Sequence, residues 1–315
     1  MECPICGGSS RGTEHSLYDD RYGYAGCFDL CACAVCDHRW LDWHPDAATI
    51  ATLYSDYYPR SEREVEDCKA PVLGNRVRAW CAGRRSSTVF WVPRGVHVLD
   101  IGCGFGESLA YHRERGCEVW GVEADRNLAR VAERFGFDVH IGLFDPSAYA
   151  PASFDVVTMN QVIEHVIDPI ETLRGVHGIL RPGGKLVIST PNASSVASRL
   201  FGRRWINWHA PYHLQFFSRE SLRRAAGSAG LELVSLETVT SSEWISYQWI
   251  HALVRPPEGR RSAFWSSTPR SAVEQAVILS LRLGHRLGFD HVLTRLCDAL
   301  QVGDNFVGVL ARTAI

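Results

Sequence analysis

Apolar and polar residues alternate along the middle of the chain in a pattern that separates short strands from amphipathic helices. Residues 96–101 form a mostly apolar run that passes directly into Gly102, Gly104 and Gly106, and a helical pattern follows. An apolar run that stops at glycines before a helix is typical of a buried parallel strand that turns into a helix. The glycines allow a ligand to approach the backbone closely, and the helix N-terminus behind them favours a negatively charged group.

The same pattern extends through the rest of the chain and predicts an α/β fold. Helices are expected over residues 72–81, 125–136, 168–180, 218–230, 271–287 and 290–300. Strands are expected over residues 96–101, 117–123, 139–142, 154–159, 185–190, 231–239 and 305–312. Strands that alternate with helices in this way predict a doubly wound, seven-stranded sheet with helices on both faces.

Polar residues and glycines mark several of the expected helix ends. Asp168, followed by a proline, and Ser271, followed three residues later by Glu274, have the sequence patterns of N-terminal caps. Asp125 is expected to cap a helix that Gly136 ends. These signals support the helices that the hydrophobic periodicity predicts.

An acidic residue at the end of the second strand points to a nucleoside ligand. Glu123 lies 23 residues after Asp100, and an acid at this place can accept hydrogen bonds from both ribose hydroxyls. A dinucleotide fingerprint would need glycine or alanine where this chain has Glu107. The spacing therefore departs from that of a typical NAD site. Leu143 and Phe144, after the third strand, are placed to meet an adenine.

Four motifs in register resemble those of the class I S-adenosylmethionine-dependent methyltransferases. They lie at residues 98–106, 119–125, 154–169 and 180–191, and their order and spacing match that family over roughly residues 96–240. The resemblance implies a Rossmann-like sheet whose last strand is antiparallel, with S-adenosylmethionine as cofactor and S-adenosylhomocysteine as product. The residues expected to bind the cofactor are Asp100, Gly102, Gly104, Gly106, Glu123, Ala124, Leu143, Phe144 and Asn160.

The first 36 residues hold six of the eleven cysteines of the chain. Two C-x2-C pairs, which suit tetrahedral thiolate coordination of Zn²⁺, are formed by Cys3, Cys6, Cys33 and Cys36. Cys31 could replace Cys33 as a ligand, and a set of buried cysteines without metal is the alternative. Four thiolates leave no position for water, so the zinc is expected to be structural and to stabilise a ribbon over residues 1–48. A ribbon ahead of such a core resembles the layout of many bacterial methyltransferases.

The remaining residues divide into a core and two additions. Residues 49–95 contain a tyrosine-rich segment, a charged linker and a helix, and the tyrosines either close over the cofactor or pack the ribbon on the core. The methyltransferase core takes residues 96–240 and 303–315. Residues 241–302 are expected to form a helical pair packed on the core, with a dimer surface, a substrate cap or a membrane-facing patch as alternatives.

Charge and hydropathy exclude other classes of protein. The formal net charge is −2, which gives no overall basic field to attract nucleic acid. No apolar run approaches the roughly 20 residues of a membrane span, and the N-terminus lacks the regions of a signal peptide. We therefore expect a cytoplasmic enzyme without nucleic acid as a partner. Residues 271–300 are the candidate surface for a homodimer or a membrane contact.

Three histidines are expected near the carboxyl ends of the strands, where open α/β sheets bind ligands: His165, His209 and His213. A hydroxyl acceptor benefits from a general base, for which histidine is the usual residue. His165 belongs to an E-H-V element that resembles one in ubiquinone-biosynthesis-like methyltransferases and is expected to position the acceptor, with His213 as the base. The leading hypothesis is transfer of a methyl group to a hydroxyl of a small molecule, with sugar or lipid-linked glycan hydroxyls favoured.

Other functions remain open as alternatives. Some RNA base methyltransferases also carry a zinc ribbon, but the ribbon here has few basic residues to contact phosphates: Arg11, Arg21 and Arg39. Asn160 also does not begin the Asn-Pro-Pro-aromatic motif of amino-methylating nucleic-acid enzymes. A nucleotide sugar or natural product methylated on carbon or nitrogen is a further alternative. A non-catalytic binding module is the remaining hypothesis, and the intact glycines and Glu123 argue against it.

Overall fold

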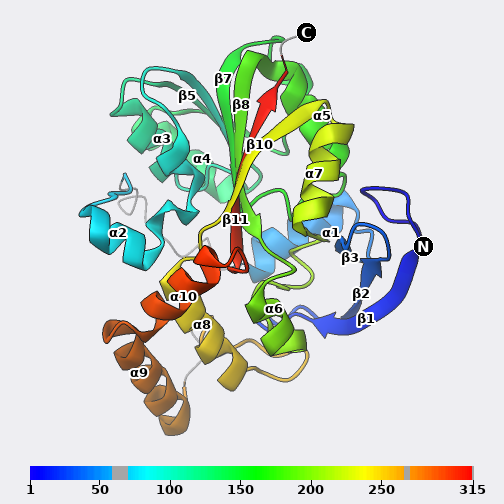
Figure 1. The fold of residues 1–315 in the computed structure, drawn as a ribbon, viewed down its shortest axis with the longest axis vertical. Coiled ribbons are helices and arrows are strands. Elements are labelled where there is room, and N and C mark those ends of the chain that lie inside the picture. Colours follow the sequence, from blue (N-terminus) through cyan, green and yellow to red (C-terminus); the bar gives the residue numbers. More distant parts are fainter. Residues whose placement is uncertain (59–69, 266–269, 314–315) are drawn as a thin grey trace.

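The computed structural model describes residues 1–58, 70–265 and 270–313, which contain two β-sheets. The larger sheet has seven strands in the order β10-β11-β8-β7-β4-β5-β6 and runs vertically in Figure 1. Its strands are β4 (His97–Ile101), β5 (Glu118–Glu123), β6 (Asp138–Ile141), β7 (Phe154–Asn160), β8 (Leu180–Pro191), β10 (Leu231–Thr238) and β11 (Asn305–Arg312). Strands β4 to β8 pair in parallel, whereas β11 pairs antiparallel with β8 and β10. The predicted doubly wound sheet is confirmed, including its antiparallel last strand.

Helices cover both faces of this sheet, which is why its central strands are apolar on both sides. α3 (Glu107–Arg113) packs on β4 and β5 at one face, while α5 (Pro169–Ile179) and α7 (Arg219–Ser228) pack together at the other (Figure 1). Leu99, Val157 and Ile188 are completely buried between these layers. Burial of each such side chain contributes roughly 1.5–3 kcal/mol to folding.

Two of the predicted capping signals act as expected. The Asp168 side chain accepts a hydrogen bond from the backbone of the first turn of α5. Ser271 and Glu274 form a reciprocal capping box at the start of α9 (Ala272–Arg286). In both places the side-chain oxygen satisfies a backbone N–H that has no partner within the helix.

Two other helices begin later than the sequence indicates. α4 (Ala129–Phe135) ends at Gly136 as predicted, but a 3₁₀ turn precedes it and its N-cap residue is Leu128. The helical stretch thus begins directly after Asp125, and the predicted cap at Asp125 stays a prediction. α2 (Arg76–Ala82) begins after Asn75, whose side chain accepts hydrogen bonds from the first turn.

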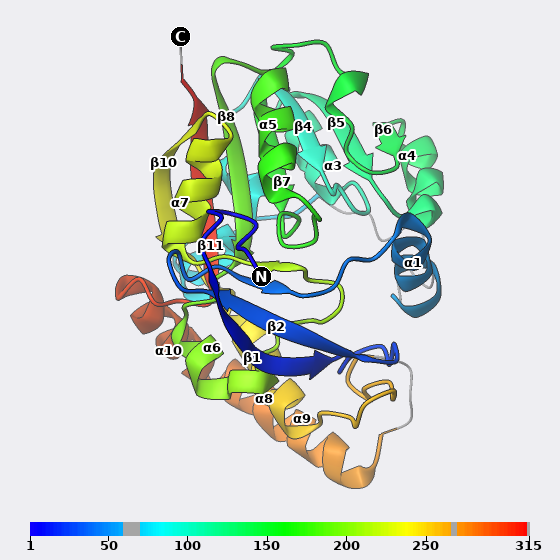
Figure 2. The same ribbon diagram turned by 90° about the vertical axis from the view of Figure 1, so that its right-hand side faces the viewer.

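The smaller sheet joins the N-terminal residues to the core. Its order is β1-β2-β3-β9, and all its neighbours pair antiparallel. The first three strands are β1 (Ser10–Tyr18), β2 (Cys27–Cys33) and β3 (Arg39–Leu41), whereas β9 (Gln215–Phe216) follows β8 in the core. Figure 2 shows β1 and β2 below the large sheet and next to α6 (Val196–Phe201). The unit predicted over residues 1–48 thus shares its sheet with a strand of the core.

The tyrosine-rich segment lies between the N-terminal unit and the core. α1 (Ala47–Thr52) continues into a π-helical turn over Leu53–Tyr57. Leu53 is buried against aromatic side chains that include Tyr212 of the core. This segment therefore packs the N-terminal unit on the core, and its Tyr58 also lines the cavity beside the glycine-rich turn after β4, so neither of the two roles considered for it is set aside. The charged linker expected over residues 60–69 lies outside the described residues.

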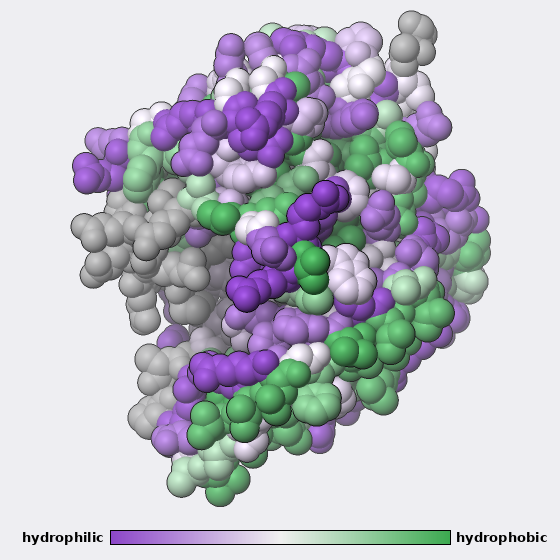
Figure 3. Space-filling view, turned by 60° about the vertical axis from the view of Figure 1, so that its left-hand side comes forward, coloured by the Kyte–Doolittle hydropathy of each residue, from purple (hydrophilic) through white to green (hydrophobic). Residues whose placement is uncertain are grey.

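The insertion contains α8 (Ser242–Leu253), α9 and α10 (Phe289–Ala299), which lie at the bottom of Figure 1. α10 packs on the rest of the protein through polar residues: Asp298 accepts hydrogen bonds from the Thr240 backbone N–H and hydroxyl at 2.9 and 2.7 Å. Its apolar stripe faces outward instead, and the exposed side chains are Val292, Leu293, Leu296 and Leu300. Together with exposed leucines of α9 they form the hydrophobic area in the lower part of Figure 3. Among the described residues, no helix combines the length and apolarity needed to cross a membrane.

Candidate active site

The glycine-rich turn after β4 lies at the carboxyl end of a central strand. Gly102 and Gly104 have φ values of +75° and +53°, a region that favours glycine. A Cβ atom on Gly102 would lie 2.4 Å from Cγ2 of Val162, whereas one on Gly104 would meet no atom within 4 Å. Packing of the protein itself therefore requires Gly102, while Gly104 borders open space.

Two buried acids hold this turn in place. Asp100 accepts hydrogen bonds from the hydroxyls of Ser108 and, at 2.6 Å, Thr158. Burial raises the pKa of Asp100 to about 6. The Glu123 carboxylate accepts hydrogen bonds from the backbone N–H of Gly104 at 2.9 Å and of Asp125 at 3.0 Å. The Glu123 carboxylate, which is expected to bind a ribose, therefore also holds the backbone of the glycine turn.

A cavity of about 650 Å³ opens beside the glycine turn. This volume lies within the range of roughly 300–1,000 Å³ that is usual for small-ligand sites. Of the predicted cofactor residues, four line its wall: Asp100, Gly102, Gly104 and Asn160. Gly106 instead caps α3, Glu123 is the last residue of β5, and Ala124 directly follows it. Neither of the two expected adenine contacts lines this wall. Leu143 is 63% exposed, and the Phe144 ring stacks on Tyr149.

The three predicted histidines meet at this cavity, and His165, His209 and His213 all line it. The ring centroid of His213 lies 4.5 Å from that of His165 and 4.9 Å from that of His209. Nδ1 of His213 is 2.8 Å from the Asn207 carbonyl oxygen, and Nδ1 of His165 is 2.9 Å from the Tyr212 carbonyl oxygen. A ring nitrogen that bonds a carbonyl must donate, so in each neutral ring Nε2 is the acceptor nitrogen.

Burial keeps His209, His213 and the neighbouring Glu164 uncharged. It lowers the pKa of His209 and His213 well below 6.5, and the charge of Arg21 adds to the effect. Glu164 is completely buried beside them, and burial raises its pKa to about 8. One ligand atom from each of Glu164, His165 and His213 lies within 4.8 Å of the others, so this set could also hold a metal ion. At neutral pH the site presents the neutral imidazoles of His209 and His213 next to a protonated Glu164 carboxyl group.

The sequence did not indicate the buried network that supports His213. Asp304 accepts hydrogen bonds from Trp205 Nε1 at 2.8 Å and from the Asn207 side-chain amide at 2.9 Å. Burial raises the pKa of Asp304 to about 7. Because the Asn207 carbonyl holds Nδ1 of His213, Asp304 fixes the segment that orients this histidine. The Gly-Asp-Asn pattern at residues 303–305 was the only signal in the sequence, and nothing local indicates its partners.

Three further residues of the cavity wall are not predicted as ligand contacts from the sequence: Arg21, Asn207 and Trp244. They come from the loop after β1, the segment after α6 and the start of α8, respectively. No short motif contains them, and they reach one wall only because the two sheets and the insertion pack together. Beyond the glycine turn, the wall of the cavity thus draws on three further, separate parts of the chain.

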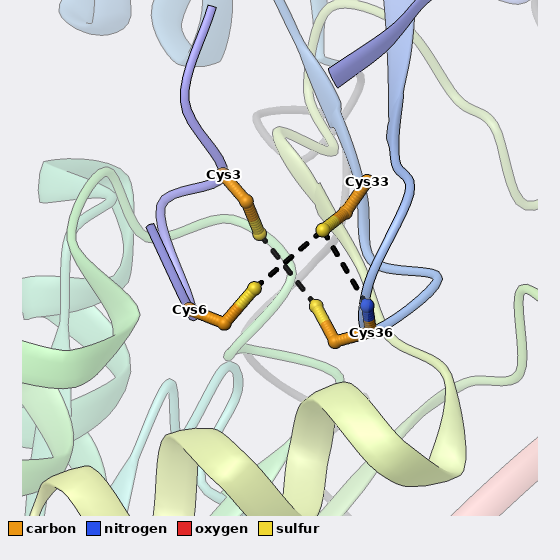
Figure 4. A group of neighbouring side chains, drawn as sticks. All are labelled: Cys3, Cys6, Cys33 and Cys36. Carbon is orange, nitrogen blue, oxygen red and sulfur yellow. Dashed lines mark hydrogen bonds between the residues drawn. The ribbon is translucent and has the colours of Figure 1, made fainter. Parts of the chain in front are cut away.

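The four cysteines of the two C-x2-C pairs lie together at the N-terminal unit (Figure 4). Cys3 Sγ is 3.6 Å from Cys36 Sγ, and Cys6 Sγ is 3.5 Å from Cys33 Sγ. Zn–S bonds of about 2.3 Å give a tetrahedron with sulfur–sulfur edges of roughly 3.8 Å. Cys31 is buried elsewhere, with its Sγ 4.0 Å from the Met1 sulfur. The number, type and spacing of the donors therefore fit a zinc ion held by Cys33 and not Cys31.

Comparisons with known proteins agree with this geometry. A family model described as a methyltransferase domain matches residues 74–236. The ubiquinone biosynthesis O-methyltransferase of Ruegeria pomeroyi is 35% identical over 167 residues, which cover 49% of this chain and 67% of that protein. The corresponding protein of Azoarcus sp. is 33% identical over 159 residues, which cover 46% and 68%.

The fold itself is shared with solved structures of low sequence identity. The crystal structure of the 4+2 cyclase SpnF superposes with a TM-score of 0.52 at 16% identity and covers 86% of this chain and 98% of that one. The sheet order and the glycine turn beside a cavity define an α/β enzyme of the nucleoside-binding type. The chain belongs to the class I S-adenosylmethionine-dependent methyltransferases. It is an enzyme that takes S-adenosylmethionine as its methyl donor.

Proposed function

We propose that this methyltransferase acts on a hydroxyl group of a small-molecule acceptor, with His213 as the general base. The observation that carries the proposal is the Nδ1 contact of His213 with the Asn207 carbonyl, at 2.8 Å. That contact leaves Nε2 as the acceptor nitrogen of a ring that lines the cavity. His165, edge to face with His213, is the positioning group.

Bound S-adenosylmethionine supplies both the methyl group and its leaving group, so the acceptor oxygen needs only alignment and loss of its proton. Glu123 and the turn at Gly102 and Gly104 would hold the nucleoside part of the cofactor. His213 Nε2 would take the proton of the acceptor hydroxyl, so that its oxygen could accept the methyl group that the cofactor would supply. The walls of the cavity orient the two reactants and limit the access of water.

Similarity to relatives that are named O-methyltransferases supports oxygen as the acceptor atom. An RNA base fits less well because the formal net charge is −2 and the N-terminal unit has few basic residues. Methylation of a nucleotide sugar or natural product on carbon or nitrogen is the second candidate. Among hydroxyl acceptors we favour sugars and lipid-linked glycans, and residues 271–300 stay the predicted surface for a dimer or a membrane contact.

The test is a methyl-transfer screen that measures release of S-adenosylhomocysteine with panels of hydroxyl, amine and thiol acceptors. Hydroxyl acceptors are expected to give turnover that depends on His213. Turnover on amines or thiols alone, unchanged in a His213→Ala variant, would contradict the proposal.

We propose in addition that Cys3, Cys6, Cys33 and Cys36 bind one structural zinc ion. Backbone N–H groups point at the Cys3 and Cys33 sulfur atoms at 3.4 and 3.3 Å, from Ile5 and Val35 respectively. Such contacts stabilise thiolates. With four protein ligands the metal would stabilise the N-terminal unit and take no part in methyl transfer.

A further inference from the structure

Arg21 reaches the cavity from the N-terminal unit, in a loop that is built to hold it. The Asp19 carboxylate accepts hydrogen bonds from the backbone N–H groups of Arg21, Tyr22 and Tyr24 at 2.8–2.9 Å. The Arg21 side chain is 4% exposed and lines the same cavity as the histidines. One of its terminal nitrogens donates to the Ile206 carbonyl oxygen. The loop thus fixes the backbone of this buried arginine, and the segment after α6 holds its guanidinium end.

No carboxylate of the described residues lies within ion-pair distance of this guanidinium group. The adjacent Asp20 pairs instead with His251 at 3.2 Å and Arg255 at 3.1 Å. Arg21 lies over the Trp265 ring at 4.5 Å, and its Nε has no hydrogen-bond partner. A buried cation without a paired anion is costly, because aromatic rings, one carbonyl and the Tyr22 side chain only partly offset its desolvation.

The Arg21 guanidinium group and the proposed base are held by the carbonyl groups of two adjacent residues. Arg21 donates to the carbonyl of Ile206, and His213 donates to the carbonyl of the next residue, Asn207. Both side chains line one cavity, so a ligand group held by Arg21 lies close to the group that His213 would deprotonate.

We propose that Arg21 binds an anionic oxygen group of the acceptor, a carboxylate or a phosphate, that lies near the methylated hydroxyl. A guanidinium group offers up to two parallel N–H bonds to such a group, which is the geometry that distinguishes arginine from lysine. This inference rests on the proposed function and narrows its substrate class to anionic acceptors. A bound anion would also offset the charge of Arg21, which lowers the pKa of His213, and so make the base more effective.

The test is calorimetric binding to the protein loaded with S-adenosylhomocysteine, in chloride buffer. The probes are inorganic phosphate, benzoate and benzamide, the uncharged counterpart of benzoate. The wild-type protein is expected to bind benzoate or phosphate saturably and benzamide at least tenfold more weakly. Arg21→Gln should weaken anion binding at least tenfold, and Arg21→Lys should weaken it less than Arg21→Gln.

Arg255→Gln is the matched control. Arg255 is also largely buried and lies over an aromatic ring, that of Tyr18 at 4.5 Å, but it pairs with Asp20 and does not line the cavity. This variant should bind the anions as the wild type does. If Arg21→Gln does not fold, the contrast between benzoate and benzamide and the Arg21→Lys variant still decide the question.

Three results would overturn the inference. They are the absence of anion binding to the wild type, equal binding by Arg21→Gln, and a loss of S-adenosylhomocysteine affinity in Arg21→Gln that matches the loss of anion affinity. The last would assign Arg21 to the carboxylate of the cofactor. Turnover of uncharged hydroxyl acceptors that depends on His213 and persists in Arg21→Gln would leave the proposed function standing while this inference fails.

Discussion

The rings of His165 and His213 meet edge to face, with centroids 4.5 Å apart and planes at 89°. His165 follows β7, whereas His213 lies in the long segment between β8 and β10. The Nδ1 atoms of both rings face backbone carbonyl oxygens. In both rings Nε2 is therefore the nitrogen left to accept a hydrogen bond. One of these acceptor nitrogens can take the proton of a hydroxyl group, and the other can accept only from a second donor, because a hydroxyl has one proton.

The first prediction concerns His213 as the base. His213→Ala is expected to lower kcat by about 100- to 10,000-fold, because the nitrogen proposed to take the hydroxyl proton is lost. Affinity for S-adenosylmethionine should not change, since the glycine turn and Glu123 follow or end β4 and β5 and do not belong to the segment that carries His213. Steady-state kinetics and calorimetry measure the two quantities separately. If His213→Ala and His165→Ala both retain near-normal turnover at neutral pH, the acceptor is acidic enough to react without a protein base.

A pair of glycine variants separates packing from cofactor binding. Both Gly102 and Gly104 have positive φ, so alanine strains the backbone by roughly 1 kcal/mol or more at either position. Only at Gly102 does the new Cβ also strike a neighbour, Val162. Gly102→Ala should therefore lower the melting temperature more than Gly104→Ala. Gly104→Ala should keep most of its stability but lose affinity for S-adenosylmethionine, because its Cβ enters the cavity. Equal melting temperatures in the two variants would contradict this assignment.

Local patterns in the sequence predicted those parts of the site that one segment builds alone. The glycine turn follows from a strand that ends at Gly102, and the meeting of His165 with His213 follows from their places after parallel strands. Arg21 could not be placed in this way. Its position depends on how the N-terminal unit docks through β9, a strand of two residues, Gln215–Phe216, with no periodicity to detect. The outward apolar stripe of α10 was missed for a related reason: periodicity identifies a stripe but not the side on which its neighbours lie.

Metal analysis should find one zinc per chain in freshly purified protein. Chelation is expected to lower the melting temperature, because a unit of this size has little core of its own and shares its sheet with the protein core through β9. Cys33→Ser should lose the metal. Cys31→Ser is the matched control, since Cys31 is equally buried but lies outside the group of four sulfur atoms. Less than about half an equivalent of zinc in the wild type would rule out the proposed site.

The last prediction concerns the pH dependence of stability that Glu164 imposes. Its carboxyl group accepts a hydrogen bond from Thr190 at 3.0 Å and lies beside His165 and His213. Burial raises its pKa from 4.5 to about 8, so between these values the folded protein holds a proton that the unfolded chain has released. The free energy of unfolding therefore falls as pH rises through this window, by at most about 1.4 kcal/mol per pH unit from this group.

Glu164→Gln removes this titration, so the variant should gain stability relative to the wild type as pH rises from 5 to 8. Urea unfolding at several pH values measures the difference in the free energy of unfolding between the variant and the wild type. The contributions of the other titrating groups largely cancel in this difference. Glu220→Gln is the control: Arg223 and Arg224 lower the pKa of the exposed Glu220 to about 2, so its effect should be constant over the same range. Parallel stability curves for the wild type and Glu164→Gln would mean that Glu164 is ionised in the folded protein and that a cation balances it.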